Sequence, residues 1–175
     1  MKTRVLGEEG YSLAAFGFSL SYNSTMERAK LLFPAYAFKQ GGENKFLESI
    51  VIWLDVTAPR FWWQEADTYR VGTTKQSEST MHTLKKTVIS QENFEYPVPP
   101  MMLEIIADMV DNNAKIEEIK NVLPEGFLQR RIWMMNYKGL QNIYNQRKNH
   151  RLPQWKIFFD DMIPNLQHPE FIIRS

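Results

Sequence analysis

The chain has 175 residues, of which 43% are hydrophobic and 23% are charged, and its formal net charge is +1. This composition is typical of a globular protein with a sizeable core, and so small a net charge excludes a global attraction to nucleic acid or acidic membranes. The absence of cysteine excludes disulfide bonds, thiolate metal sites and a cysteine nucleophile.

No metal site, membrane span or secretion signal is predicted either. The three histidines lie far apart, whereas metal motifs need close local spacing. No apolar run approaches the roughly 20 residues of a membrane helix. Glu8 and Glu9 interrupt the N-terminal stretch, which makes it a poor signal peptide. We therefore expect one cytoplasmic domain over residues 1–175, with no membrane partner and no sign of nucleic-acid binding.

The first third of the chain predicts a short strand and at least one helix. Residues 1–6 are consistent with a strand, whereas residues 11–22 fit a strand and a helix equally well. Ser24 or Thr25 is placed to cap a helix that starts in "MERAKLLF". Pro34 is expected to kink or end that helix.

A buried strand precedes a long polar stretch. The segment Ile50–Val56 predicts this strand, and residues 60–83, "RFWWQEADTYRVGTTKQSESTMHT", follow it. Trp62 and Trp63 would alternate across the strand end, with one ring in the core and one at the surface or an interface. Residues 96–100, "YPVPP", predict a rigid extended connector.

The rest of the chain has helical periodicity. Apolar residues recur at helical spacing over residues 102–122, with a break near Asp111–Asn113. A longer helix is predicted from about Phe127 to Asn149, and a last one begins at Pro153 and stops at Pro164. The order of the elements predicts an α+β fold, with a central mixed sheet and long C-terminal helices.

The predicted helix between Phe127 and Asn149 carries unusual polar residues. Asn136 and Arg147 are eleven residues apart, which is about three helical turns, so both lie on one face together with Ile143. Asn and Arg are seldom buried without partners. Arg147 either extends to water, pairs with an internal carboxylate, or binds a ligand.

A family resemblance favours the ligand. The segment over residues 122–155 resembles the last third of flavin-dependent thymidylate synthases. In that family a Leu-Pro turn is followed by an aromatic residue, an Asn that opens a helix, a second Asn six residues on, an Arg five further, and a Gln-Trp pair opening the last helix. The matching residues here are Leu123, Pro124, Trp133, Asn136, Asn142, Arg147, Gln154 and Trp155.

The resemblance implies a fold and a set of ligands. The fold would be that of the thymidylate synthase-complementing proteins, assembled as a homotetramer with sites between subunits. Asn136 and Asn142 would contact the flavin of FAD, and Arg147 would bind the phosphate of the nucleotide dUMP. Lys120 stands where the family has a phosphate-binding Arg, so the charge is kept without the bidentate geometry. An active enzyme would also use NADPH and methylenetetrahydrofolate.

The polar stretch partly resembles the family signature R-H-R-x-x-S-x-N-x-x-S-x-R, which it matches in full in neither of two registers, since a shift by one residue matches Ser79 but loses Arg70. With Arg70 at the third position, Tyr69 stands where the His belongs, Lys75 replaces the Asn, and Gln64 is the upstream Gln. The resemblance implies cofactor binding by Tyr69 and Arg70 and nucleotide binding by Gln64. Two signature arginines are missing.

The residues themselves leave other roles open. Gln64 would hydrogen-bond a base or satisfy a strand end. Arg70 would hold a phosphate or pair with Asp67 or Glu78. His82 is either an acid–base group or a structural residue.

The residues and the resemblance together lead to three alternative hypotheses for the function. The first is a divergent flavin-dependent thymidylate synthase that methylates dUMP. The second is an inactive derivative that keeps nucleotide, flavin or protein binding on the same fold, of viral, phage-like or mobile-element origin. The third is a related enzyme acting on another pyrimidine nucleotide.

Overall fold

The computed structural model of the chain describes residues 1–86 and 88–174, without the side chain of His82. As predicted, the chain combines helices with a sheet. The described residues form one four-stranded sheet in the order β1-β2-β4-β3. Its strands are β1 (Lys2–Glu9), β2 (Val51–Pro59), β3 (Thr73–Ser77) and β4 (Leu128–Asn136).

Helices lie between these strands along the chain and also follow the last of them. The α-helices are α1 (Tyr11–Ser21), α2 (Met26–Tyr36), α3 (Arg60–Ala66), α4 (Thr80–Thr83), α5 (Pro100–Asp111), α6 (Ile116–Val122), α7 (Tyr137–Arg147) and α8 (Pro153–Met162). Short 3₁₀ turns are η1 (Lys45–Ser49), η2 (Leu84–Lys86), η3 (Gln91–Asn93), η4 (Ile163–Asn165) and η5 (Pro169–Phe171). None of the described helices is long and apolar enough to cross a membrane.

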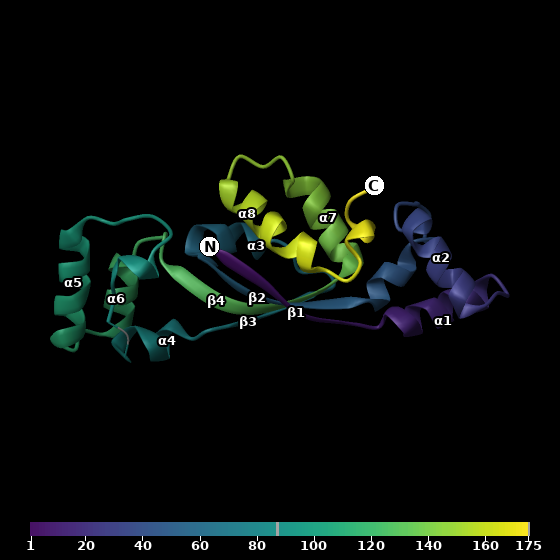
Figure 1. Cartoon of the computed structure of the whole chain (residues 1–175). Coiled ribbons are helices and arrows are strands. Elements are labelled where there is room, and N and C mark those ends of the chain that lie inside the picture. Colours follow the sequence, from purple (N-terminus) through teal and green to yellow (C-terminus); the bar gives the residue numbers. More distant parts are fainter. Residues whose placement is uncertain (87, 175) are drawn as a thin grey trace.

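The sheet lies between two groups of helices. In Figure 1, α7 and α8 cover one face of the sheet, α1 and α2 lie beyond one end, and α4, α5 and α6 lie beyond the other. A large core fills the space between the sheet and α3, α7 and α8, and it extends to α1 and α2. We call residues 80–122 the helical lobe. It has a separate small core that includes Ile106 and Ile119.

All strand pairs are antiparallel, although the sequence predicts a mixed sheet. Strand β2 pairs with β1 on one side and β4 on the other, and β3 is the edge strand next to β4. The buried residues Ile52, Leu54 and Val56 alternate along β2, as expected for a strand with one face in the core.

The predicted helix from Phe127 to Asn149 is wrong in its first part, because β4 occupies residues 128–136. Trp133 and Met135 are buried at alternate positions, which is the spacing of a strand rather than of a helix. Strand β4 is the central partner of β2 and β3, and this tertiary pairing overrides local helical spacing. For this reason α7 is shorter than predicted, whereas α8 begins at Pro153 as predicted and ends at Met162, two residues before Pro164.

Two further local expectations can be compared with the structure. Thr25 caps α2 as predicted by accepting a hydrogen bond from the Arg28 N–H at 3.2 Å, and Pro34 lies inside α2 without ending it, so that of the two expected effects only a kink stays a prediction. Trp62 and Trp63 belong to helix α3 rather than to a strand end, and both rings are buried. The two tryptophans therefore belong to the core.

Candidate functional site

Helix α3 leads into a loop at residues 67–72, which connects it to the edge strand β3. Gly72 ends this loop with a backbone φ of 66°, a conformation that residues with a side chain rarely adopt. A Cβ atom at Gly72 would lie 2.7 Å from the Asn136 side-chain nitrogen. The glycine thus lets the loop approach the start of α7.

Behind this loop lies a group of charged and aromatic side chains in mutual contact. We call this group the inner cluster, and its members are Glu65, Arg147, His150 and Trp155. The Glu65 carboxylate accepts hydrogen bonds from Arg147 Nη1 at 2.9 Å and from the Trp155 indole at 2.8 Å. Arg147 Nη1 also lies 2.8 Å from His150 Nε2. Arg147, whose side chain is 19% exposed, therefore has an internal carboxylate partner.

A chain of hydrogen bonds runs from Arg147 to the surface. Arg147 Nε donates to the Tyr69 hydroxyl at 2.8 Å, and this hydroxyl donates to Gln146 Oε1 at 3.0 Å. Gln146 Nε2 in turn donates to Asn142 Oδ1 at 3.0 Å. The Asn142 amide N–H groups donate to none of the described residues, so these donors are left for another partner.

The same residues border a cavity of about 310 Å³, which we call the loop cavity. Its walls are the loop and α7, with Thr68, Tyr69, Arg70, Val71, Thr73, Gly139, Asn142, Ile143 and Gln146. Arg70 is exposed, and in the described part of the chain it makes no ion pair with Asp67 or Glu78. Three predicted site residues, Tyr69, Arg70 and Asn142, thus meet at one cavity.

Asn136 lies next to this cavity but has a structural contact of its own. It is the N-cap of α7, where its side-chain oxygen accepts a hydrogen bond from the Gly139 N–H at 2.8 Å. This bond satisfies one of the free N–H groups at the helix start. A role for Asn136 in flavin binding stays a prediction.

The structure does not bring Gln64 and Lys120 to the loop cavity. Gln64 is exposed and donates to Glu125 Oε2 at 2.9 Å. Lys120 lies in the last turn of α6, in the helical lobe. Their nucleotide roles stay predictions, as does any role of His82, whose side chain lies outside the described residues.

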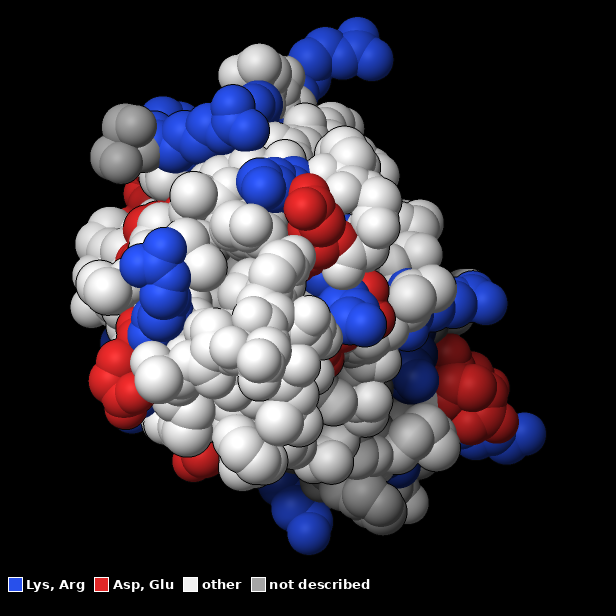
Figure 2. Space-filling model, turned by 90° about the vertical axis from the view of Figure 1, so that its right-hand side faces the viewer, with Lys and Arg blue, Asp and Glu red and all other residues white. Residues whose placement is uncertain are grey.

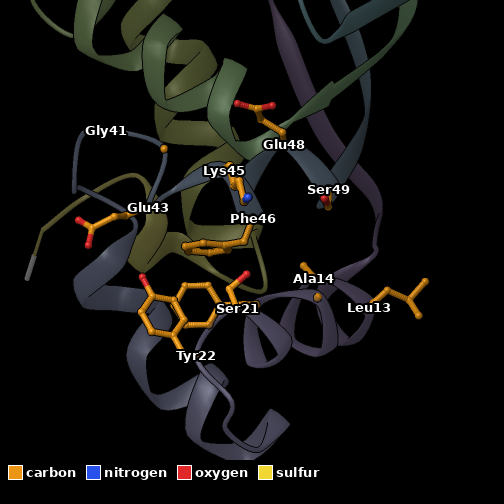
Figure 3. Close-up of a pocket in the computed structure, with 13 residues that line it drawn as sticks. Leu13, Ala14, Ser21, Tyr22, Gly41, Glu43, Lys45, Phe46, Glu48 and Ser49 are labelled. Carbon is orange, nitrogen blue, oxygen red and sulfur yellow. The ribbon is translucent and has the colours of Figure 1, made fainter.

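A second cavity, larger than the loop cavity, is one that the sequence did not indicate. It measures about 720 Å³ and lies between α1, the loop at residues 41–43 and η1. Figure 3 shows Phe46 of η1 above Ser21 and Tyr22 from the end of α1, with Glu43 directed outward. Its walls come from segments that are separate in the sequence, and "GGENK" by itself predicts only a turn.

The fold and the loop cavity define an α+β protein with a ligand-sized recess beside the edge strand. The sequence profile of the family described as thymidylate synthase complementing protein matches residues 9–162. This match spans most of the chain, and the chain belongs to that family. A search of curated protein sequences gives no match.

Solved structures are similar to the chain over nearly its full length. Thymidylate synthase X from Helicobacter pylori, determined with FAD and dUMP, has a TM-score of 0.84 and 16% identity, and the alignment covers 99% of this chain and 98% of that chain. A second structure, the flavin-dependent thymidylate synthase ThyX from Helicobacter pylori complexed with FAD and dUMP, has the same TM-score and coverage at 15% identity. At such low identity, the TM-score shows a shared fold and nothing beyond it.

Proposed function

We propose that the chain is a divergent flavin-dependent thymidylate synthase-like protein that binds FAD and dUMP or a related pyrimidine nucleotide. The observation that carries the proposal is the meeting of Tyr69, Arg70 and Asn142, from two distant segments, at the loop cavity. Family membership and the FAD and dUMP of the solved relatives support it.

The donors at the loop cavity fit part of a phosphorylated ligand. Arg70 offers a guanidinium without an internal partner among the described residues, and Asn142 offers amide N–H groups. A volume of about 310 Å³ is at the small end of ligand sites, so it suits a mononucleotide or one portion of FAD. Arg70 would hold a phosphate, and Asn142 would donate to a ring carbonyl.

The proposed reaction is methylation of the pyrimidine base, with methylenetetrahydrofolate as carbon donor and NADPH as reductant. A bound flavin supplies hydride chemistry that side chains do not provide. In this chain the protein's own contribution would be to bind and orient the two ligands, because there is no cysteine nucleophile in the sequence.

Reconstitution with FAD tests the binding part of the proposal. The purified protein should acquire visible flavin absorption that survives gel filtration, and dUMP should bind with measurable heat in a calorimeter. Tritium release from labelled dUMP, in the presence of NADPH and methylenetetrahydrofolate, then measures turnover. A protein that binds neither FAD nor dUMP would refute the proposal.

A second candidate function is binding without catalysis. It is favoured by the inner cluster, because Glu65 already neutralises Arg147, the residue to which the family resemblance gives a phosphate. Such a derivative would bind flavin or nucleotide, or a protein partner, without turnover. FAD binding combined with no tritium release would select this candidate over the enzyme.

We also propose that the protein is a homo-oligomer, as the resemblance implies. Figure 2 shows the end of the molecule formed by α1 and α2 as a broad surface with few charges at its centre. Leu13, Phe16 and Leu20 of α1 are largely exposed, and exposed apolar patches commonly mark interfaces. Light scattering should give a mass above that of one chain, and Leu20→Asp should lower it.

A further inference from the structure

A lysine of the edge strand lies almost buried beneath the loop at residues 67–72. The Lys75 side chain is 11% exposed, although lysines usually extend their ammonium groups to water. Its Nζ donates to the Tyr69 carbonyl oxygen at 2.9 Å, and it lies 4.6 Å from the centre of the Trp133 ring. Burial lowers the pKa of Lys75, and the nearby Asp67 carboxylate opposes that decrease.

A second cation reaches the same loop from the neighbouring strand. Arg131 Nη1 donates to both oxygens of Asp67, at 2.9 and 3.0 Å, and its guanidinium lies 4.4 Å from the centre of a Trp63 ring. Lys75 Nζ is 3.7 Å from the same carboxylate. Two cations therefore converge on Asp67, the first residue of the loop.

The sheet register explains why both cations reach the loop. Lys75 of β3 stands opposite Trp133 of β4, and Ser77 stands opposite Arg131. Residues two apart in a strand point to the same face, so the two cations extend over one face of the sheet. The aromatic rings below them supply a cation–π contact in place of water.

These contacts fix the loop at two points. The carboxylate of Asp67 holds its start, and the Tyr69 carbonyl oxygen accepts from both Lys75 and the Thr73 hydroxyl, the latter at 3.0 Å. Neither cation lines the loop cavity, whereas Tyr69 and Arg70 do. The negative charge of Asp67 also offsets the positive charges of Lys75 and Arg131, which would otherwise repel the Arg70 guanidinium.

We propose that Lys75, with Asp67 and Arg131, is a positioning residue that holds the loop so that Tyr69 and Arg70 meet the ligand. This inference rests on the proposed function, because the ligand is the FAD or dUMP assigned above. In the signature alignment Lys75 replaces an Asn, so the arrangement belongs to this chain rather than to the motif. Burying an ammonium group costs free energy unless its hydrogen bonds are kept. The Lys75 ammonium keeps its bond to the Tyr69 carbonyl oxygen only in this loop conformation, so the side chain favours that conformation.

The test compares Lys75→Met with Lys75→Arg and with a matched control, Lys156→Met, whose lysine is exposed on α8. FAD and dUMP are titrated separately, and backbone hydrogen exchange of a peptide covering residues 67–72 is followed. Lys75→Met should weaken the binding of at least one ligand about tenfold, the effect of losing one charge-assisted contact. It should also speed exchange in the loop. Lys75→Arg should restore most of the affinity, and the control should behave like the parent.

The outcomes separate this inference from the proposed function. A parent protein that binds neither ligand refutes the proposed function, and the inference falls with it. A parent that binds while Lys75→Met keeps parental affinity, or loses affinity without faster loop exchange, overturns the inference alone. If Lys75→Met does not fold, Asp67→Asn replaces it under the same criteria, because Asp67 is half exposed and the change removes the carboxylate charge toward which both Lys75 and Arg131 converge.

Discussion

The inner cluster and the loop cavity each contain an arginine that the family resemblance assigns to a ligand. One of them, Arg147, is bonded to internal partners, whereas the other, Arg70, is available to a ligand. Arg147 donates to Glu65 and Tyr69 and touches His150. Arg70 is exposed beside the loop cavity and has no ion pair among the described residues. The comparison teaches that position in a motif does not determine whether a cation is available, because a nearby carboxylate decides it.

The largest expected effect is the loss of stability on removing Arg147. Arg147→Ala leaves the Glu65 carboxylate, which is 33% exposed, with the Trp155 indole and His150 as its remaining polar side-chain partners among the described residues. Removing one partner of a buried ion pair is strongly destabilising, so we expect the free energy of unfolding to fall by about 2–3 kcal/mol. Urea unfolding followed by tryptophan fluorescence measures this change.

The matched control for Arg147→Ala is the double variant with Glu65→Gln, which removes the stranded charge as well. It should be more stable than Arg147→Ala alone. Unchanged stability of Arg147→Ala, together with lost nucleotide binding, would contradict the structural role and place Arg147 in the ligand site.

The next effect is on binding rather than stability. Arg70→Ala should weaken the binding of FAD or dUMP about tenfold, because one charge-assisted hydrogen bond is lost. Unfolding stability should change by less than about 0.5 kcal/mol, as for other exposed side chains. Calorimetric titration and urea unfolding give the two numbers, and Arg28→Ala, an exposed arginine of α2, is the control. Parental affinity in Arg70→Ala would remove this residue from the site.

The sequence predicted where the C-terminal elements lie better than whether each is a helix or a strand. The family resemblance, in which an Asn opens a helix, correctly implied that a helix starts after Asn136. Helical periodicity failed over residues 128–136, because β4 is fixed by pairing with β2 and β3, which are distant in sequence. A pairing between residues so far apart leaves no local signal.

The same limit applies to the site. The sequence left open whether Arg147 pairs with an internal carboxylate, and only the fold shows that Glu65, on a different helix, reaches it. The sequence does not indicate that Glu65 is the partner of Arg147, since a carboxylate after a strand has many roles. The contact between Asp67 and Arg131 was equally inaccessible, because Arg131 lies in a segment predicted as helix.

A smaller effect distinguishes the two asparagines assigned to the flavin. Asn136→Ala removes the N-cap of α7 and should lower the free energy of unfolding by about 1 kcal/mol. Asn142 is exposed and caps nothing, so Asn142→Ala should leave stability nearly unchanged and reduce ligand affinity instead. Thermal unfolding and FAD titration of both variants test this. An exchange of the two effects would mean that Asn136 is the ligand contact.

The smallest expected effect is that of Lys120→Ala. Lys120 is carried by α6 in the helical lobe, whereas the loop cavity lies between residues 68–73 and α7. Within one chain, removing it should cost only the favourable interaction of a cation with the end of α6, about 0.3 kcal/mol, and leave FAD and dUMP affinity within about twofold of the parent. Titration of the variant at several protein concentrations makes the result informative. A loss of affinity seen only where the protein self-associates would mean that Lys120 reaches the cavity of a neighbouring copy, and then the cation that compensates for the engaged Arg147 comes from a second chain.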